Sequence, residues 1–246
     1  MNDDYLINYL EKYNDIRFNN IQNKQDKVRA LMNITMPIDL SNEFYQKQDE
    51  YLQNLRKDKP LFDANDILKD KQIALFLGDI TTIKADAIVN ACNSRLLGCL
   101  APLHYCIDNA IHSFGGLQIR RDIMNIMNGT LEPNGKCKVT KAYNLPSQYI
   151  FHTVGPIYNG VITKQMETDL TNCYLSCLQQ ADNMKLDNIV FCSISTGVFG
   201  FPIDKASKIA INTVKDYLTK HNSKIRVIFN LFSQKDYEIY ERQLEH

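Results

Sequence analysis

The sequence predicts a layered α/β fold with a mixed sheet, preceded by a helical extension. From Ile73 onward, short β-rich runs alternate with amphipathic helices, which is typical of a domain built on a mostly parallel or mixed sheet. Before about Leu68, apolar residues recur at intervals of three and four, which is typical of helices. The composition changes at about residue 70, so we expect a helical extension over residues 1–70 and an α/β domain over residues 71–246.

Local patterns predict each element. In the extension, helical spacing covers Tyr5 to Tyr13, Lys27 to Met32 and Leu40 to Leu55, and Pro37 and Pro60 interrupt it. The expected strands are Ile73 to Leu77, Ala87 to Ala91, Lys136 to Ala142, Tyr149 to Val154, Asn188 to Cys192 and Arg226 to Leu231. The expected helices of the domain are Leu103 to Phe114, Leu117 to Met127, Lys164 to Met184, Pro202 to Leu218 and Lys235 to Leu244.

The overall charge excludes two classes of partner. The 246 residues include 28 basic and 28 acidic side chains, so no overall field draws the chain to nucleic acid or to an anionic membrane. No apolar run reaches the roughly 18 to 20 residues of a membrane span, and the first residues lack the order of a signal peptide. We therefore expect a cytoplasmic protein without nucleic-acid or membrane partners.

The seven cysteines do not form the pattern of a disulfide framework, because their number is odd and their spacing is irregular. Cys173 and Cys177 stand at helical spacing and Cys192 lies in an apolar run, so we expect these three to be small buried hydrophobic residues. Only Cys99 and Cys106 have neighbours that suggest another use.

Polar side chains follow the first two expected strands of the domain. Asp79 in Gly78-Asp79-Ile80-Thr81 either accepts a hydrogen bond from an amine such as that of adenine or caps a turn. Asn90 and Asn93 either bind ribose hydroxyls or satisfy the backbone of their loop. Ligands of open α/β sheets bind at this edge, where strands end.

A third loop, Ser193 to Pro202, contains two glycines and two hydroxyl residues directly before an expected helix. Glycine lets backbone N–H groups approach a diphosphate, and the N-terminus of the helix favours negative charge. The loop matches neither a Walker loop nor a dinucleotide fingerprint. Phe199 and Phe201 either shield a sugar or pack in the core.

Three potential metal ligands lie within eight residues at Cys99, His104 and Cys106. Thiol and imidazole together favour zinc, and three protein ligands leave one position open, as catalytic zinc sites do. The ligands converge only if Pro102 marks a loop or an irregular turn, because residues two apart point to opposite sides of a regular helix. The spacing is not a common zinc-finger spacing, and two free cysteines with a surface histidine explain it equally well.

Two further polar residues begin the helix after these ligands. Asp108 is either a carboxylate that stabilises the helix N-terminus or a group that orients a ribose hydroxyl or a water. His112 is expected to be an ordinary helix residue with its hydrogen bonds satisfied.

Five ordered segments resemble the motifs of macrodomains, which are ADP-ribose-binding α/β/α modules. These segments are Gly78 to Thr81, Val89 to Ser94, Ile107 to His112, Ile150 to Pro156 and Ser195 to Gly200. Common macrodomain hydrolases carry a glycine-rich loop before the aspartate, whereas this sequence has Gly98 to Cys106 with a histidine inside it. In this respect it resembles the zinc-dependent macrodomains, a group of microbial protein-ADP-ribose hydrolases, and residues 29–52 are similar to the helical extension of that group.

The resemblance implies a three-layer α/β/α macrodomain and a role for each motif. Asp79 and Ile80 would receive the adenine, and the loop from Ser195 to Phe199 would hold the diphosphate. The full expected ADP-ribose-binding set is Asp79, Ile80, Asn90, Asn93, Cys106, Ile107, Asp108, Ser195, Thr196, Gly197, Val198 and Phe199. The expected catalytic residues are Asp108 and Asn93, and the expected ligands of one Zn²⁺ per chain are Cys99, His104 and Cys106.

The expected function is therefore a glycosidic-type hydrolase that removes mono-ADP-ribose from aspartate and glutamate side chains of modified proteins, with free ADP-ribose as product. A second hypothesis is a non-catalytic reader of ADP-ribose in which zinc only stabilises the loop. A third is an unrelated zinc hydrolase, which would leave the Ser195 to Gly200 loop without a purpose.

Overall fold

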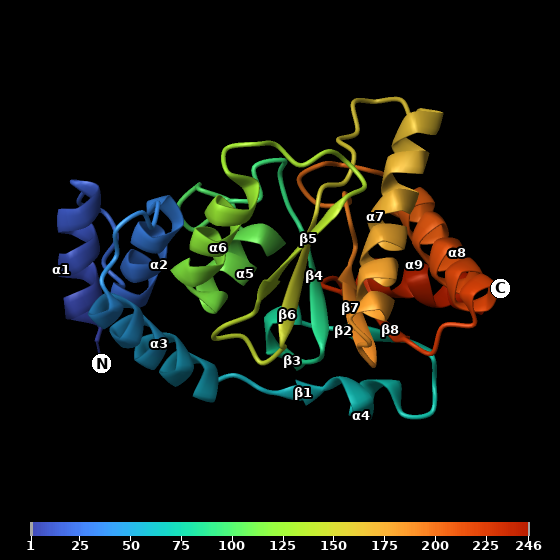
Figure 1. The fold of residues 1–246 in the computed structure, drawn as a ribbon, viewed down its shortest axis with the longest axis horizontal. Helices are drawn as coiled ribbons and strands as arrows, with labels where there is room; N and C mark the ends of the chain where they lie inside the picture. The colour runs from blue at the N-terminus through green and yellow to red at the C-terminus, as the bar shows by residue number, and fades with distance from the viewer. Residues whose placement is uncertain (1, 246) are drawn as a thin grey trace.

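A six-stranded mixed sheet forms the centre of the computed structural model, which describes residues 2–245 (Figure 1). Its strand order is β2 (Ile73–Leu77), β8 (Arg226–Leu231), β7 (Asn188–Cys192), β4 (Ala87–Ala91), β6 (Tyr149–Thr153) and β5 (Cys137–Lys141). Neighbouring strands are parallel, except that β5 runs antiparallel to β6 at the edge. The predicted strands and the mixed sheet are thus confirmed.

Helices cover both faces of this sheet. The helices are α5 (Ile107–Gly115), α6 (Leu117–Met127), α7 (Lys164–Asn183), α8 (Ile203–His221) and α9 (Gln234–Leu244). In Figure 1, α5 and α6 lie on one side of the sheet and α7, α8 and α9 on the other, which gives the three-layer α/β/α architecture. Aromatic side chains from both strands and helices, such as Phe191, Phe229 and Tyr174, are at most 1% exposed in the core between them. The apolar runs of the inner strands β4, β7 and β8 are therefore buried from both sides, as is usual for parallel strands.

The N-terminal helices form a second, smaller cluster beside α5 and α6 (Figure 1). They are α1 (Asp3–Asn14), α2 (Lys24–Ile34) and α3 (Asn42–Lys57). Leu6, Leu31 and Phe44 are fully buried in this cluster, and Leu117 of α6 joins them. The extension therefore packs against the α/β domain. The division into a unit of residues 1–70 and a unit of residues 71–246 stays a prediction. Residues 1 and 246, at the ends of these two units, lie outside the described part.

Four short elements, two before β2 and two between β2 and β4, were not predicted. They are β1 (Phe62–Asp63), α4 (Ala64–Leu68), the 3-10 helix η1 (Ile80–Thr82) and β3 (Ile83–Lys84). β1 pairs in parallel with β3, and Ala64 and Leu68 of α4 are buried in the main core. Elements of two to five residues are too short for apolar periodicity to reveal them.

The predicted helix Leu103 to Phe114 begins four residues too early. Leu103 has a left-handed backbone with φ of 58°, and α5 begins only at Ile107. Cys106 takes the N-cap position, where its thiol accepts a hydrogen bond from the N–H of Asn109 at 3.4 Å. His104 therefore lies in a loop rather than on a helix.

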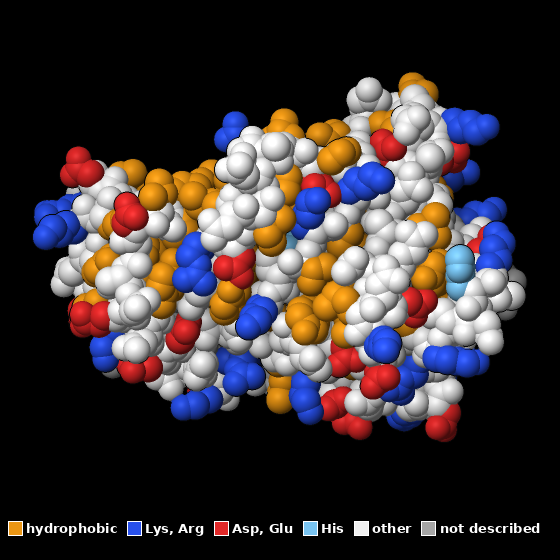
Figure 2. Space-filling view, viewed as in Figure 1, with side chains coloured by type: hydrophobic (Ala, Val, Ile, Leu, Met, Phe, Trp, Pro, Cys, Tyr) orange, Lys and Arg blue, Asp and Glu red, His pale blue; other side chains and the backbone are white. Residues whose placement is uncertain are grey.

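The surface agrees with the balanced charge of the sequence. On the face shown in Figure 2, basic and acidic side chains are interspersed and neither sign forms a continuous patch. Within residues 2–245, none of the helices combines the length and the apolarity that crossing a membrane requires. Cys173, Cys177 and Cys192 are buried, as predicted.

Candidate active site

The carboxyl ends of the parallel strands bring the predicted loops to one edge of the sheet. The loops that follow β4, β6 and β7 lie together at the upper end of the strands in Figure 1. They carry the asparagines of residues 90–93, the turn at residues 154–156 and the glycine loop of residues 193–202. The motifs that are separate in the sequence therefore form one candidate site, as open α/β sheets favour.

Asp79 both caps a turn and keeps an oxygen accessible. Its Oδ1 accepts hydrogen bonds from the N–H of Thr81 at 2.9 Å and from the Thr81 hydroxyl at 2.7 Å, which fixes the start of η1. Its Oδ2 lies 3.3 Å from the Lys59 ammonium, and the side chain is 37% exposed. The two alternatives for Asp79 are thus compatible, since a capping carboxylate has a second acceptor. Ile80 beside it is buried.

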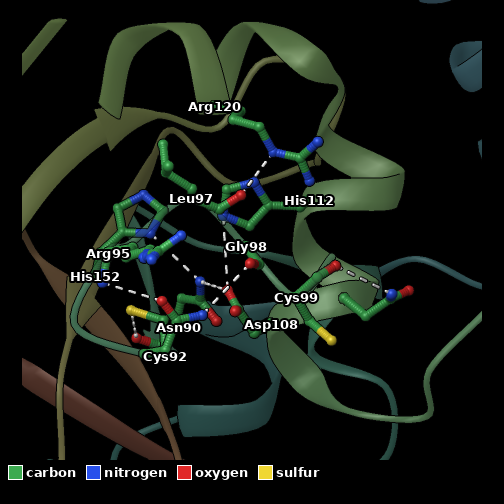
Figure 3. Close-up of polar contacts among 12 residues, drawn as sticks. Asn90, Cys92, Arg95, Leu97, Gly98, Cys99, Asp108, His112, Arg120 and His152 are labelled. Atoms are coloured by element: carbon green, nitrogen blue, oxygen red, sulfur yellow. Dashed lines mark hydrogen bonds and ion pairs between the residues drawn. The ribbon is translucent and has the colours of Figure 1, made fainter. Parts of the chain in front are cut away.

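A buried hydrogen-bond chain runs beneath the site from β5 to α5, and Figure 3 shows its part from His152 through Asn90 to Asp108. Asn90 donates through Nδ2 to Asp108 Oδ1 at 2.8 Å, and the same Nδ2 lies 3.3 Å from His152 Nδ1. His152 Nε2 lies 2.9 Å from the Thr140 hydroxyl. Burial lowers the pKa of His152 to about 3, so the ring is neutral. A neutral ring that accepts at Nδ1 and donates at Nε2 satisfies every contact in this chain.

The neutral state of His152 predicts a loss of stability in acid. Because the pKa is about 3 when folded and 6.5 when exposed, the unfolded chain binds more protons as the pH falls below about 7. When the pH falls from about 7.5 to about 5, this residue should lower the free energy of unfolding by about 2 kcal/mol. Denaturant unfolding of His152→Gln at both pH values should show a decline smaller by that amount. His221→Gln, at an exposed position, is the control and should keep the wild-type decline. An equal decline in all three proteins would contradict the assignment.

Asp108 is a buried carboxyl at the first turn of α5. Burial raises its pKa to about 6, although the hydrogen bond from Asn90 and the charge of Arg120 act in the opposite direction. Its Oδ1 lies 3.6 Å from Nε2 of His112, one helical turn further on. Burial, with help from Arg120 and His152, holds the pKa of His112 well below 6.5, so this contact is not an ion pair. Asp108 thus lies at the helix N-terminus, as one alternative expected, and its role toward a ribose hydroxyl or a water stays a prediction.

His112 is not the satisfied helix residue that the sequence suggested. Within the described residues, neither of its ring nitrogens has a hydrogen-bond partner, and the side chain is buried. The ring packs under Gly98, where an added Cβ would approach it to 2.7 Å (Figure 3). Gly98 also has φ of 82°, so both backbone and space require glycine before Cys99.

Cys99, His104 and Cys106 converge. Their ligand atoms all lie within 4.8 Å of one another, and Cys99 Sγ is 3.4 Å from His104 Nδ1. The left-handed Leu103 and a backbone hydrogen bond from His104 N–H to Ala101 at 3.2 Å fold the loop so that all three face inward. Burial raises the pKa of the Cys106 thiol to about 12. A cation between the three groups would favour the thiolate instead.

These residues fit a zinc ion. Tetrahedral bonds of about 2.0 to 2.3 Å place two ligand atoms roughly 3.5 Å apart, which agrees with the 3.4 Å between Cys99 and His104. Two sulfurs and one imidazole are the donors that zinc prefers over magnesium or calcium. This is the one Cys and His group of its kind found within residues 2–245. The loop conformation that the sequence left open is therefore the convergent one.

The glycine loop after β7 presents backbone donors at the site. In the described structure, none of the backbone N–H groups of residues 196–199 donates to a protein acceptor. Ser195 has a left-handed backbone with φ of 66°, and its buried hydroxyl has no partner within residues 2–245. A Cβ on Gly155 would approach that hydroxyl to 2.1 Å, so glycine is needed there. Unpaired N–H groups before the N-terminus of α8 suit an anion. Phe201 is only 1% exposed and belongs to the core, while Phe199 is half-buried.

Asn93 has a structural role in this geometry. Its side chain accepts from the Arg95 N–H at 3.0 Å and donates to the Gly98 carbonyl at 3.4 Å, so it holds the first part of the loop after β4 together. His152 and Arg120 also contact this site, and no role was predicted for either. The register of β4 and β6 places His152 opposite Asn90. A polar residue inside each of two apolar runs is the sequence signal that could have pointed to this pair.

Comparisons with known proteins agree with this site. Residues 89–210 match the family model of the Macro domain. The chain is 42% identical over 248 residues to a protein-ADP-ribose hydrolase of Staphylococcus aureus, covering 97% of this chain and 93% of that protein. It is 42% identical over 251 residues to a protein-ADP-ribose hydrolase of Treponema medium, covering 97% and 96%. A Trypanosoma brucei macrodomain in complex with ADP-ribose superposes with a TM-score of 0.67 at 28% identity, covering 88% of this chain and 94% of that one. The chain is therefore a hydrolase that belongs to the macrodomain family, among the protein-ADP-ribose hydrolases.

Proposed function

We propose that the chain is a zinc-dependent hydrolase that removes mono-ADP-ribose from aspartate and glutamate side chains of modified proteins. The observation that carries this proposal is the convergence of Cys99, His104 and Cys106 two residues before the buried Asp108. ADP-ribosylated protein is the substrate and partner, and free ADP-ribose is the product. We propose the cytoplasm as its compartment, because free thiols that ligate zinc stay reduced there.

The proposed binding mode follows the loops along the sheet edge. Asp79, through its accessible oxygen, and Ile80 receive the adenine, and the N–H groups of residues 195–199 receive the diphosphate. The ribose next to the scissile bond lies against Asn90, Asn93 and residues 106–108. In support, a macrodomain with 28% identity to this chain has been solved in complex with ADP-ribose.

The proposed chemistry is cleavage of the bond between the anomeric carbon of the ribose and the carboxylate oxygen. Water supplies the new hydroxyl of the anomeric carbon, and its proton ends on the departing carboxylate or in solvent. A zinc ion held by Cys99, His104 and Cys106 would polarise an oxygen of the substrate or lower the pKa of a bound water. Asp108 orients a ribose hydroxyl or the attacking water, and Asn90 orients Asp108. We assign catalysis to Asp108 with support from Asn93.

The preference for acidic side chains rests on the leaving group. A carboxylate leaves as a stable anion, whereas an alkoxide leaving group needs a proton donor. The two histidines buried beside Asp108 are neutral, because burial lowers the pKa of His152 to about 3 and that of His112 well below 6.5. They are therefore poor proton donors at neutral pH, which favours ester-linked substrates over serine-linked ones.

A release assay tests this function. A protein carrying mono-ADP-ribose on aspartate or glutamate should lose the label to solution when incubated with the chain, and serine-linked label should stay on its carrier. Stripping the metal with a chelator should stop release, and Zn²⁺ should restore it. A reader module would retain the label in every condition. Full turnover by protein shown to contain no metal would refute the zinc dependence, and release from serine at the same rate would refute the preference.

A further inference from the structure

Helix α2 of the extension contacts the loop that carries the three ligands. We define residues 97–106 as the ligand loop. Three polar side chains link this loop to α2: Arg29 and Asn33 of α2 itself, and Arg120 of α6. Their hydrogen bonds between α2 and the rest of the chain span 70 residues or more of sequence. Such contacts matter because a loop with left-handed residues at both Gly98 and Leu103 has no regular secondary structure to hold its shape.

Arg29 acts on the middle of the ligand loop through Asn109. The guanidinium donates to Asn109 Oδ1 from Nη2 at 2.8 Å and from Nε at 3.2 Å. Since arginine has no acceptor, this pair forces the amide nitrogen of Asn109 to point the other way. That nitrogen donates to the carbonyl of Ala101 at 3.0 Å and lies 3.5 Å from that of Cys99, a proposed ligand. Asn109 is fully buried, so these partners do not compete with water.

Asn33 holds the end of the same loop. It is 1% exposed, and its Oδ1 accepts from the N–H of Leu103 at 3.0 Å. Its Nδ2 donates to the Ser113 hydroxyl at 2.9 Å, which in turn donates to Asn109 at 3.2 Å. Leu103 directly precedes His104, so this bond fixes the left-handed turn that presents the imidazole.

Arg120 holds the start of the loop and the end of α2 together. From α6, its Nε donates to the carbonyl of Leu97 at 2.6 Å (Figure 3). Its Nη1 donates to the carbonyl of Met32 at 3.0 Å and to that of Thr35, at the C-terminus of α2. A cation at a helix C-terminus is favourable, and burial of the guanidinium at 1% exposure makes these bonds costly to break.

We infer that α2 positions the zinc ligands, with Arg29 and Asn33 as positioning residues that act through Asn109 and Leu103. This inference rests on the proposed zinc site. It assigns the extension a part in the reaction, because the fold of the ligand loop depends on side chains that lie outside the α/β domain. Removing a group that orients a metal ligand commonly lowers metal affinity by about 10- to 100-fold.

Arg29→Met tests the inference in the full-length chain. Methionine keeps an apolar stem against Phe114, on which the guanidinium rests at 5.6 Å, and removes the two hydrogen bonds to Asn109. Zn²⁺ affinity, measured by competition with a chromophoric chelator, should fall about tenfold or more. At limiting Zn²⁺, kcat should fall while KM and the Kd for free ADP-ribose stay within about twofold, and excess Zn²⁺ should restore kcat. Hydrogen exchange of residues 97–106 in metal-free protein should become faster.

Lys27→Met is the matched control, since Lys27 lies on the same helix and has no side-chain partner within residues 2–245. It should behave as wild type in all four measurements. Wild-type zinc affinity and wild-type exchange of the ligand loop in Arg29→Met would overturn the inference and leave the proposed function intact. A wild-type chain that binds no Zn²⁺ would overturn the zinc site itself, and the positioning of zinc ligands with it.

Discussion

A Cys99→Ser variant is expected to lose hydrolysis of ADP-ribosylated protein by about 100-fold or more in kcat, while it binds free ADP-ribose as wild type does. Cys99 faces His104 Nδ1 at 3.4 Å, and serine supplies a hard, neutral oxygen where zinc prefers a thiolate. Cys99 is outside the residues proposed to contact ADP-ribose. Loss of one of three ligands should therefore remove the metal and leave the nucleotide cleft in place.

Cys137→Ser is the control for this prediction. Cys137 is a half-buried free cysteine on β5, and in the described part of the chain its thiol donates to the carbonyl of Lys138 and not to the ligand loop, so zinc content and turnover should be unchanged. Elemental analysis, calorimetric titration with ADP-ribose and the release assay together give the result. If Cys99→Ser turned over as fast as Cys137→Ser, the metal-dependent mechanism would be refuted. Loss of ADP-ribose binding together with zinc would instead make the metal a structural part of the cleft.

The sheet was predictable because its signals are local. Apolar runs such as Ala87–Ala91 and Asn188–Cys192 are buried in the centre of the sheet, and their ends coincide with those expected from the sequence. The same holds for α6, whose bounds Leu117–Met127 were predicted. The start of α5 was wrong by four residues, since a thiol at the N-cap is an unusual signal and the left-handed turn at Leu103 has no glycine to mark it.

The interior of the site was less predictable, because its contacts join distant segments. Arg29 and Asn109 are 80 positions apart, and nothing in either neighbourhood specifies the other. From its place on a helix, His112 was expected to have its hydrogen bonds satisfied. The ring instead lies between Gly98 and His152, and neither ring nitrogen has a hydrogen-bond partner in the described structure. The three ligands stood out by residue type, whereas their convergence depended on a loop that α2 holds from outside.

Asp108→Asn is expected to separate activity from stability. The amide has nearly the same shape, and its oxygen still accepts from Asn90 at the position of Oδ1, 2.8 Å away. Its nitrogen would take the place of Oδ2, while Nε2 of His112 stays 3.6 Å from the retained oxygen. The substitution removes a buried charge and keeps the acceptor for Asn90, so the variant should be as stable as wild type or more stable by about 1 kcal/mol.

Activity should move the other way. A neutral amide neither stabilises positive charge that develops on the ribose nor accepts a proton from water, so kcat should fall about 100-fold or more. The KM should change much less, because the diphosphate loop and Asp79 supply most of the proposed contacts. Asp122→Asn, half-buried on α6 away from the ligand loop, is the matched control and should keep full turnover. Denaturant unfolding and the release assay on the same preparations give both quantities. An Asp108→Asn chain that unfolds more easily and loses turnover only in proportion would reduce Asp108 to a structural residue, because the loss of activity would then follow from the loss of folded protein.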